Sequence, residues 1–171
     1  DLFDCFAWGA ESWVDVTSPL LARITNSGVK LDWPGGCSGV VVNRTNGDVT
    51  VKVVSQGLWR SRDHGATWER IDSSTISGRD ETGWATTVDP DSPGRISTFS
   101  LDGKAGWSND GREWKRFTDL GRNWDYGSVD WSSAQPTTII GARHETAPPG
   151  EIHVSRDGGN TWRLLDVRLS E

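Results

Sequence analysis

The chain of 171 residues contains no methionine, one tyrosine and two cysteines. It has no apolar run near the length of a membrane-spanning helix, which needs about 20 residues, so we expect no membrane insertion. Basic residues are outnumbered: 18 Lys and Arg face 24 Asp and Glu, for a net charge of −6. Nucleic-acid-binding domains usually present a basic surface. The charge balance therefore argues against a nucleic-acid partner.

The two cysteines, Cys5 and Cys37, leave two alternatives open. In an oxidising compartment they could form a disulfide that joins the N-terminal segment to the rest of the chain; otherwise they are two unrelated thiols. With no histidine nearby, they predict no metal site. The chain starts at Asp1 rather than methionine, so we expect that an upstream segment was removed or lies outside this sequence. We expect a secreted or periplasmic location.

The chain is rich in tryptophan, with eleven residues, and several of them end a repeated turn sequence. The first copy runs from Ser61 to Trp68 and reads SRDHGATW; the third runs from Ser155 to Trp162 and reads SRDGGNTW. A middle copy, SNDGREW, starts at Ser108 and is one residue shorter. The three serines lie at intervals of 47 residues. A fixed period of about 20–50 residues indicates a propeller, a solenoid or a similar array.

The residues of each copy explain why it turns. Ser and Asp side chains accept hydrogen bonds from nearby backbone N–H groups, glycine supplies a positive φ, and tryptophan packs over the turn as an apolar anchor. We expect Trp13 to be an anchor as well. The residues expected in these structural roles are Ser61, Asp63, Gly65, Trp68, Ser108, Asp110, Gly111, Trp114, Ser155, Asp157, Gly159 and Trp162.

Strand-like runs fill the rest of each period, and no segment shows a helical period. Each period therefore predicts four short antiparallel strands, the unit of a β-propeller blade. We predict an all-β fold with a single domain over residues 1–171, made of about three full blades and part of a fourth. The predicted blade ranges are 1–32 (partial), 33–72, 79–118 and 124–168.

The octapeptide S-x-D-x-G-x-x-W resembles the Asp-box, or bacterial neuraminidase repeat, and the blade pattern covers roughly residues 33–168. Sialidases, other glycoside hydrolases, lectins, sortilin-type receptors and photosystem assembly factors contain this repeat. The resemblance implies that the box forms the outer turn between the third and fourth strands of a blade. It also implies that ligands bind on the opposite face.

The predicted number of blades is too small for most propellers, which close with about 4–8. Three and a half blades would leave open sheet edges. We therefore expect either a homodimer that closes a ring of about seven blades or a part of a longer chain that completes the propeller. A small ring of four blades, closed by the N-terminal segment, is a third alternative.

Candidate ligand-binding residues lie on the face opposite the repeated turns, where the chain passes between blades and between second and third strands. Two equivalent connections each carry a Gly-Arg pair, a carboxylate and an aromatic residue, and the loop 143–149 adds charged residues. The ligand-binding candidates are Arg79, Asp80, Trp84, Arg122, Trp124, Asp125, Tyr126 and His144. The alternative is that these loops are solvated turns with weak ion pairs.

These side chains suit a sugar, because aromatic rings stack on a pyranose while Arg and Asp bind hydroxyl or acidic groups. Sialidases use a tyrosine nucleophile, a partner carboxylate and an arginine cluster; the resemblance makes Tyr126, Asp125 and Glu145 weak catalytic candidates. Arginines that could form the clamp are Arg23, Arg79, Arg122 and Arg143.

We favour a carbohydrate-recognising module over two alternatives. These are a glycoside hydrolase, of the sialidase type or the xyloglucan-active endoglucanase type, and a protein-assembly scaffold. No cofactor is expected. Asp89, Asp91 and Asp102 are either turn formers or ligands of a structural calcium ion.

Overall fold

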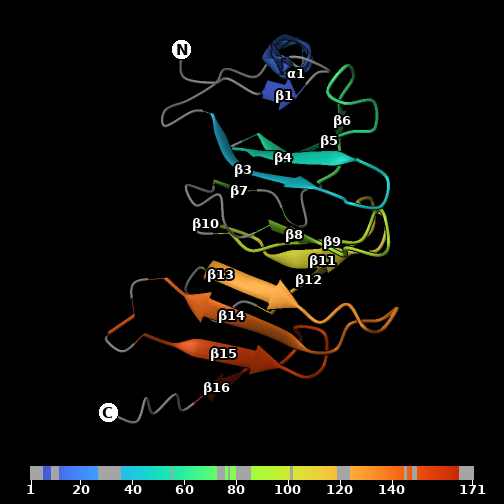
Figure 1. The fold of residues 1–171 in the computed structure, drawn as a ribbon. Coiled ribbons are helices and arrows are strands. Elements are labelled where there is room, and N and C mark those ends of the chain that lie inside the picture. The colour runs from blue at the N-terminus through green and yellow to red at the C-terminus, as the bar shows by residue number, and fades with distance from the viewer. Residues whose placement is uncertain are drawn as a thin grey trace.

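The structure is a computed structural model. It describes residues 6–8, 12–26, 36–54, 56–72, 76, 78–79, 86–100, 102–118, 124–144, 146–147 and 150–165. Three four-stranded antiparallel sheets follow one another along the chain and are stacked in chain order (Figure 1).

Each sheet is a blade whose strands lie side by side in the order of the sequence. Blade 1 consists of β3 (Cys37–Val42), β4 (Val49–Val53), β5 (Gly57–Ser61) and β6 (Glu69–Arg70). Blade 2 consists of β8 (Thr86–Val88), β9 (Ile96–Thr98), β11 (Gly106–Ser108) and β12 (Trp114–Arg116). Blade 3 consists of β13 (Trp124–Val129), β14 (Ile139–Arg143), β15 (Ile152–Ser155) and β16 (Arg163–Leu165). The first strands of neighbouring blades contact one another. These up-and-down sheets confirm the predicted fold class of propeller blades.

Two shorter antiparallel pairs accompany the blades. β1 (Phe6–Trp8) pairs with β2 (Trp13–Asp15) as a hairpin, and β7 (Gly78–Arg79) pairs with β10 (Asp102–Gly103). Trp13 was expected to be a buried anchor, but its side chain is 65% exposed. The other anchors are covered because they lie beside a preceding element, and within the described residues no blade precedes this hairpin. Trp13 is thus not an anchor of the same kind.

One helix, α1 (Thr17–Thr25), contradicts the expectation that no segment is helical. Pro19 lies in its first turn, where a missing N–H costs nothing. Leu20 and Ile24, four residues apart on one helix face, are fully buried against blade 1 with Trp59. Nine residues are too few for the helical period to stand out in the sequence. No helix among the described residues is long and apolar enough to cross a membrane.

The three repeated turns share one hydrogen-bond pattern. We call them the first turn (61–68), the second turn (108–114) and the third turn (155–162). In each turn, the serine hydroxyl donates to the aspartate carboxylate at 2.9, 3.0 and 2.8 Å, respectively. The same oxygen accepts the glycine N–H at 2.7, 2.8 and 2.8 Å. The three glycines have φ values of +91°, +76° and +92°, which explains why glycine is needed there.

A threonine strengthens the first and third turns. Thr67 and Thr161 each donate their hydroxyl to the aspartate at 2.6 Å. The hydrogen bonds from Thr161, followed by the one from Ser155, lower the pKa of Asp157 to about 2. The second turn is one residue shorter, and there the backbone N–H groups of Arg112 and Glu113 bind Asp110 instead, at 2.7 and 3.0 Å.

Each turn packs against the preceding element of the chain. A Cβ atom on Gly65 would lie 2.7 Å from the Cβ of Val16, and one on Gly111 would lie 3.3 Å from the Cβ of Ile71. A Cβ on Gly159 would overlap the ring of Phe117. The contacted residues lie three positions after the preceding tryptophan of the series, and they are Val16, Ile71 and Phe117. Glycine is therefore required for close approach as well as for φ.

The interface between blades 1 and 2 contains buried polar groups. Lys52 of β4 donates its ammonium to the Thr98 hydroxyl at 3.0 Å and to the Phe99 carbonyl at 2.9 Å. Arg60 of β5 donates to the Asp110 carbonyl in the second turn at 3.1 Å. Burial lowers the pKa of Lys52 to about 7, because a low-dielectric surrounding disfavours the charged form.

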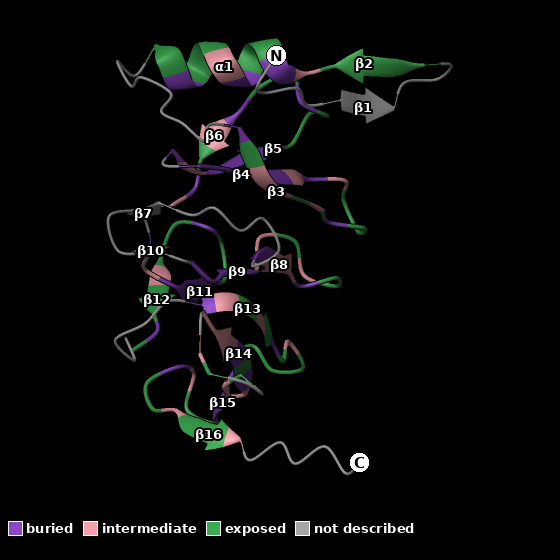
Figure 2. Ribbon diagram, turned by 90° about the vertical axis from the view of Figure 1, so that its left-hand side faces the viewer, coloured by how far each residue is buried: buried purple, intermediate pink, exposed green. Residues whose placement is uncertain are grey.

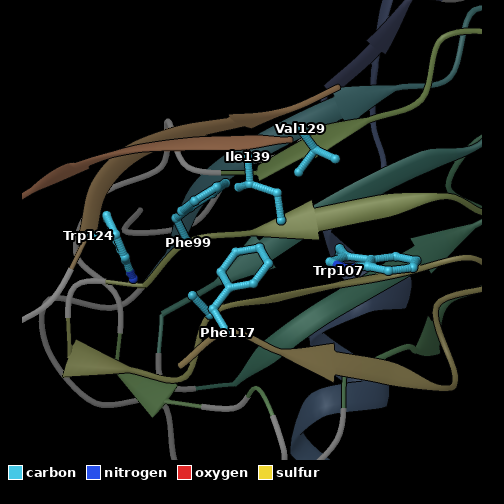
Figure 3. Close-up of a cluster of buried hydrophobic side chains, with 7 residues drawn as sticks. Phe99, Trp107, Phe117, Trp124, Val129 and Ile139 are labelled. Carbon is cyan, nitrogen blue, oxygen red and sulfur yellow. The ribbon is translucent and has the colours of Figure 1, made fainter. Parts of the chain in front are cut away.

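The interface between blades 2 and 3 is aromatic (Figure 3). The rings of Phe99 and Phe117 lie 5.3 Å apart, and those of Trp124 and Trp162 lie 4.6 Å apart. Trp107 adds a hydrogen bond from its indole N–H to the Gly158 carbonyl at 3.4 Å. The buried residues of this cluster are Phe99, Ala105, Trp107, Phe117, Trp124, Val129 and Ile139.

Candidate functional site

Two of the residues predicted to bind ligand, Asp125 and His144, lie in contact on blade 3. The Nδ1 atom of His144 lies 2.6 Å from the Oδ1 atom of Asp125. Strand register explains the contact: Trp124 of β13 is paired with Arg143 of β14, so the next residue on each strand lies at the same end of the sheet. The third turn follows Ser155, which pairs with Ile139 at the other end of β14. The pair therefore lies opposite the repeated turns, as expected.

Tyr126 stands beside this pair. The register shifts between Trp124 and Tyr126, which leaves Asp125 without a partner opposite it on β14. Such a bulge re-aims side chains and is common next to functional sites. The Tyr126 side chain is 51% exposed, whereas Asp125 and His144 are 26% and 31% exposed. A carboxylate and an imidazole are thus accessible together, and a phenol ring is exposed on the next residue of β13.

A second charged group lies on the same sheet. Arg143 donates to Glu151 at 2.8 Å, and His153 Nε2 lies 3.1 Å from the same carboxylate oxygen. The hydrogen bond from His153, and then the charge of Arg143, lower the pKa of Glu151. Arg143 is therefore paired with a neighbouring carboxylate, the alternative to a role as a substrate clamp. The sequence analysis did not identify Glu151 as the partner of Arg143. Its position just before β15, at the end of the loop that follows Arg143, could have indicated the pair.

Trp124 was predicted to bind ligand, and its position contradicts a stacking role. The side chain is only 4% exposed, and its ring packs edge-on against Phe99 at 6.1 Å. Trp124 is the first residue of β13 and not a loop residue, and its backbone N–H donates to the Ser100 carbonyl of blade 2. Gly141 gives the ring its space: a Cβ there would lie 2.5 Å from the indole. A glycine on the neighbouring strand could therefore have indicated that the Trp124 ring packs against the sheet.

The remaining predicted residues are only partly described. Arg79 lies in β7, and its backbone pairs with Asp102 of β10. Arg23 lies in α1 beside Trp59 and Arg70 on blade 1, far along the chain from the Asp125–His144 pair. The predicted residues that lie outside the described residues are Asp80, Trp84, Arg122, Glu145 and Cys5, and with Cys5 the proposed disulfide to Cys37.

A hollow of about 670 Å³ lies on the opposite face, between blades 2 and 3. Arg95 lies in it with its guanidinium 4.9 Å from the centre of the Trp131 ring. Arg95 donates to the Trp131 carbonyl at 3.1 Å and also to the Ser133 carbonyl and the Asp89 carboxylate. These bonds give Arg95 a structural role in joining the two blades.

Asp89, one of the residues considered for calcium, is a turn former. Its carboxylate accepts the N–H of Asp91 at 2.9 Å in addition to the bond from Arg95. Within the part of the chain that the structure describes, no group of three or more His, Cys, Asp or Glu side chains is placed to hold a metal ion.

Comparisons with known proteins support the fold. No family model matches this chain, and no curated protein matches it. The GH74 enzyme of Niastella koreensis superposes with a TM-score of 0.59 and 18% identity, over 93% of this chain and 26% of that enzyme. The GH74 xyloglucanase from Xanthomonas campestris superposes with a TM-score of 0.51 and 19% identity, over 75% of this chain and 21% of that enzyme. This chain thus spans about a quarter of these enzymes. At such identities the likeness shows the fold alone: consecutive four-stranded antiparallel blades like those of these two structures.

Proposed function

We propose that this chain is a carbohydrate-recognising propeller module related to glycoside hydrolases. We place its ligand site at the end of blade 3 that carries Asp125, Tyr126 and His144. The observation that carries the proposal is the 2.6 Å contact between Asp125 and His144, nineteen residues apart in sequence. A carboxylate and an imidazole can bind neighbouring sugar hydroxyls, and a half-exposed phenol ring can stack on the pyranose.

Three further points belong to the proposal. The repeated turns are Asp-boxes, which is supported by the shared Ser–Asp–Gly hydrogen bonds and by their place between third and fourth strands. The module works outside the cytoplasm, as a secreted or periplasmic protein. Xyloglucan is the first ligand to test, because one structural neighbour is named a xyloglucanase.

Catalysis is the second candidate, because the fold is that of GH74 glycoside hydrolases. Most such enzymes need a pair of carboxyl groups, one of which has a raised pKa and donates a proton. Glu151 has a lowered pKa and is held by Arg143 and His153. Glu151 is therefore unsuited to proton donation, and we prefer binding to turnover for the described residues.

Calorimetric titration with xyloglucan oligosaccharides and with a sialylated trisaccharide tests both candidates. We expect saturable binding to one of them, and Asp125→Asn should weaken it about tenfold or more, since hydrogen bonds to charged groups contribute about 1.5–3 kcal/mol. Asp91→Asn is the matched control, because Asp91 is exposed on the opposite face. Equal affinities of Asp125→Asn and the wild type would contradict this site. Release of reducing sugar would favour the hydrolase.

A further inference from the structure

The hollow between blades 2 and 3, on the face of the repeated turns, is a second candidate binding site. Its volume of about 670 Å³ falls within the range of about 300–1,000 Å³ that is usual for small-molecule sites. Its walls come from the turn between β8 and β9, from the second turn, and from the turn between β13 and β14. The hollow thus lies between two complete four-stranded sheets and not at an end of the stack.

The turn between β13 and β14, the orange loop at the right of Figure 1, is longer than its counterparts. In each blade, a backbone N–H after the first strand donates to a carbonyl before the second strand, and this bond encloses residues 43–48, 89–95 and 130–138. Residues 132–135 of the longest turn are exposed (Figure 2) and form one wall of the hollow. Loops that lengthen in one repeat often carry a binding function.

Trp131 does not occupy an apolar position of the repeat. It directly follows the first residue of its turn, and the residues at this place in blades 1 and 2 are Arg44 and Pro90. Between blades 1 and 2 the turns are bridged directly, because the Thr45 hydroxyl donates to the Pro90 carbonyl at 2.7 Å. Between blades 2 and 3, Arg95 makes the bridge, and the hollow lies beside it. The blade architecture therefore does not require a tryptophan at this place.

The indole of Trp131 is held in place while its N–H remains available. The ring packs against the aromatic cluster and under the Arg95 guanidinium. Within the described residues, its N–H donates to no protein atom and is not fully buried. Trp162 packs against the same cluster, but its unpaired N–H is buried. Because an indole N–H usually has a hydrogen-bond partner, Trp131 offers a fixed donor to a molecule in the hollow.

The other polar groups that line the hollow are mostly uncharged or already paired. Arg95 is the cation of the lining, and it donates to the Asp89 carboxylate. Asp91 is exposed and accepts a hydrogen bond from Arg44 at 2.8 Å. The remaining amide and hydroxyl groups belong to Ser92, Asn109, Ser132, Ser133 and Gln135. This lining suits an uncharged ligand that has many hydroxyl groups.

We propose that the hollow binds an uncharged saccharide, at a site separate from the Asp125–His144 pair. Sugar hydroxyls both donate and accept, so amides, hydroxyls and an indole N–H can all bind them. The part of the Trp131 ring that lines the hollow contacts the apolar C–H surface of the sugar. An acidic sugar would find no unpaired cation among the lining residues to bind its carboxylate. The proposal does not depend on the ligand site proposed above, which lies at the other end of the blade.

Nuclear magnetic resonance of the isotope-labelled full chain tests the proposal, with the indole N–H signal of Trp131, once assigned, as the probe. Xyloglucan and galactomannan oligosaccharides, added to about 10 mM so that millimolar affinities are detected, should shift this signal. Trigalacturonic acid, in which every sugar is charged, should not. The absence of a shift with both neutral probes, or a shift with the acidic one, would overturn the proposal.

The affinity for the neutral probe that binds more tightly tests the role of the indole N–H. Calorimetry should show that Trp131→Phe weakens binding about threefold to tenfold, the expected loss for one hydrogen bond. Trp162→Phe is the matched control and should bind like the wild type, because the Trp162 N–H is buried. Thermal unfolding verifies that both variants are folded. Equal affinities of the two variants would contradict the site.

Asp125→Asn separates this proposal from the proposed function. The shift of the Trp131 signal, and the sugar concentration at its midpoint, should be unchanged in this variant. If Asp125→Asn abolished the shift, the signal would report binding at the other site, and the hollow would not be a site of its own. An unchanged shift together with no effect of Asp125→Asn on total binding would instead contradict the site at Asp125 alone.

Discussion

The two interfaces between blades are built at equivalent positions but from different chemistry. Between blades 1 and 2, Lys52 and Arg60 reach carbonyl groups of the next blade. Between blades 2 and 3, the space is filled by stacked rings, with Phe117 and Trp124 both nearly fully buried. The first interface therefore combines these hydrogen bonds with an apolar cluster that includes Leu58, Ile71 and Ile96, whereas the second depends mainly on the burial of aromatic rings.

What the two interfaces share is a donor to the next turn. Arg60 and Trp107 occupy the same place before the turn serine, and each donates to a backbone carbonyl, of Asp110 and Gly158 respectively. A guanidinium and an indole are chemically unlike, yet both reach from the sheet to the turn. The comparison teaches that the repeat preserves a contact to backbone atoms, while the side chain that makes it varies.

The largest effect is expected from opening the aromatic interface. Trp124→Ala should lower the free energy of unfolding by about 3–5 kcal/mol, the range for removing a buried aromatic ring. Urea denaturation measures it. Tyr126→Ala, two residues away but half exposed, is the matched control and should cost less than about 1 kcal/mol. A near-neutral Trp124→Ala would show that the ring is not part of the core.

A smaller loss is expected from removing the polar contact between blades 1 and 2. Arg60→Met keeps most of the side-chain volume but removes the donors to Asp110 and Gly94, which should cost about 1.5–3 kcal/mol. Denaturant unfolding of Arg62→Met supplies the control, because Arg62 is 55% exposed and pairs with Asp48 and Glu69 of its own blade. If both variants lost the same stability, the contact to the turn would contribute nothing.

The buried Lys52 in the interface between blades 1 and 2 predicts a pH dependence of stability. The pKa of Lys52 is lowered to about 7 in the folded state from 10.5, so between these values the unfolded state binds the extra proton. Stability should therefore rise with pH in this window, by about 1.4 kcal/mol per pH unit, and the gain is absent below the folded-state pKa. Lys52→Met should remove this slope.

Unfolding of the wild type and of Lys52→Met in urea, at about pH 7.5 and 8.5 within the affected window, measures the difference. Parallel stability profiles for the two proteins would mean that Lys52 keeps its ordinary pKa in the fold.

The smallest effect is expected from removing the shared donor in the aromatic interface. Trp107→Phe loses the indole N–H bond to Gly158 while much of the apolar surface remains, so the loss should be about 0.5–1.5 kcal/mol. Thermal unfolding by calorimetry resolves it. A loss as large as that of Trp124→Ala would instead assign the main contribution of Trp107 to packing.

The blades could be predicted from the sequence because the turns are local. Ser61, Asp63 and Gly65 bond among themselves within five residues, so their identity fixes the turn wherever the chain lies. The helix α1 was missed because its two buried residues, Leu20 and Ile24, show no period on their own. Short amphipathic segments gain their stability from the surface that they cover.

The sequence predicted which residues lie at the same end of a blade, but it did not predict which way each side chain points. The blade pattern brought Asp125 and His144 to one end of blade 3, and the structure has them in contact. It could not decide whether Trp124 faces a ligand or the core, because a shift of one residue moves a strand side chain to the other face of the sheet. Glu151 was missed since its partners are set by hairpin register.

The glycine of each later turn packs on a residue that directly follows the last strand of the preceding blade, and this order affects how the chain folds during synthesis. Ile71 leaves the ribosome about 40 residues before Gly111, the glycine that covers it, and Phe117 likewise precedes Gly159. The face of blade 1 that packs on blade 2 is therefore solvent-exposed until blade 2 has been synthesised. Each interface forms between neighbouring repeats, as in other repeat proteins. Folding that proceeds toward the C-terminus during synthesis would therefore pack each new turn onto the blade already made.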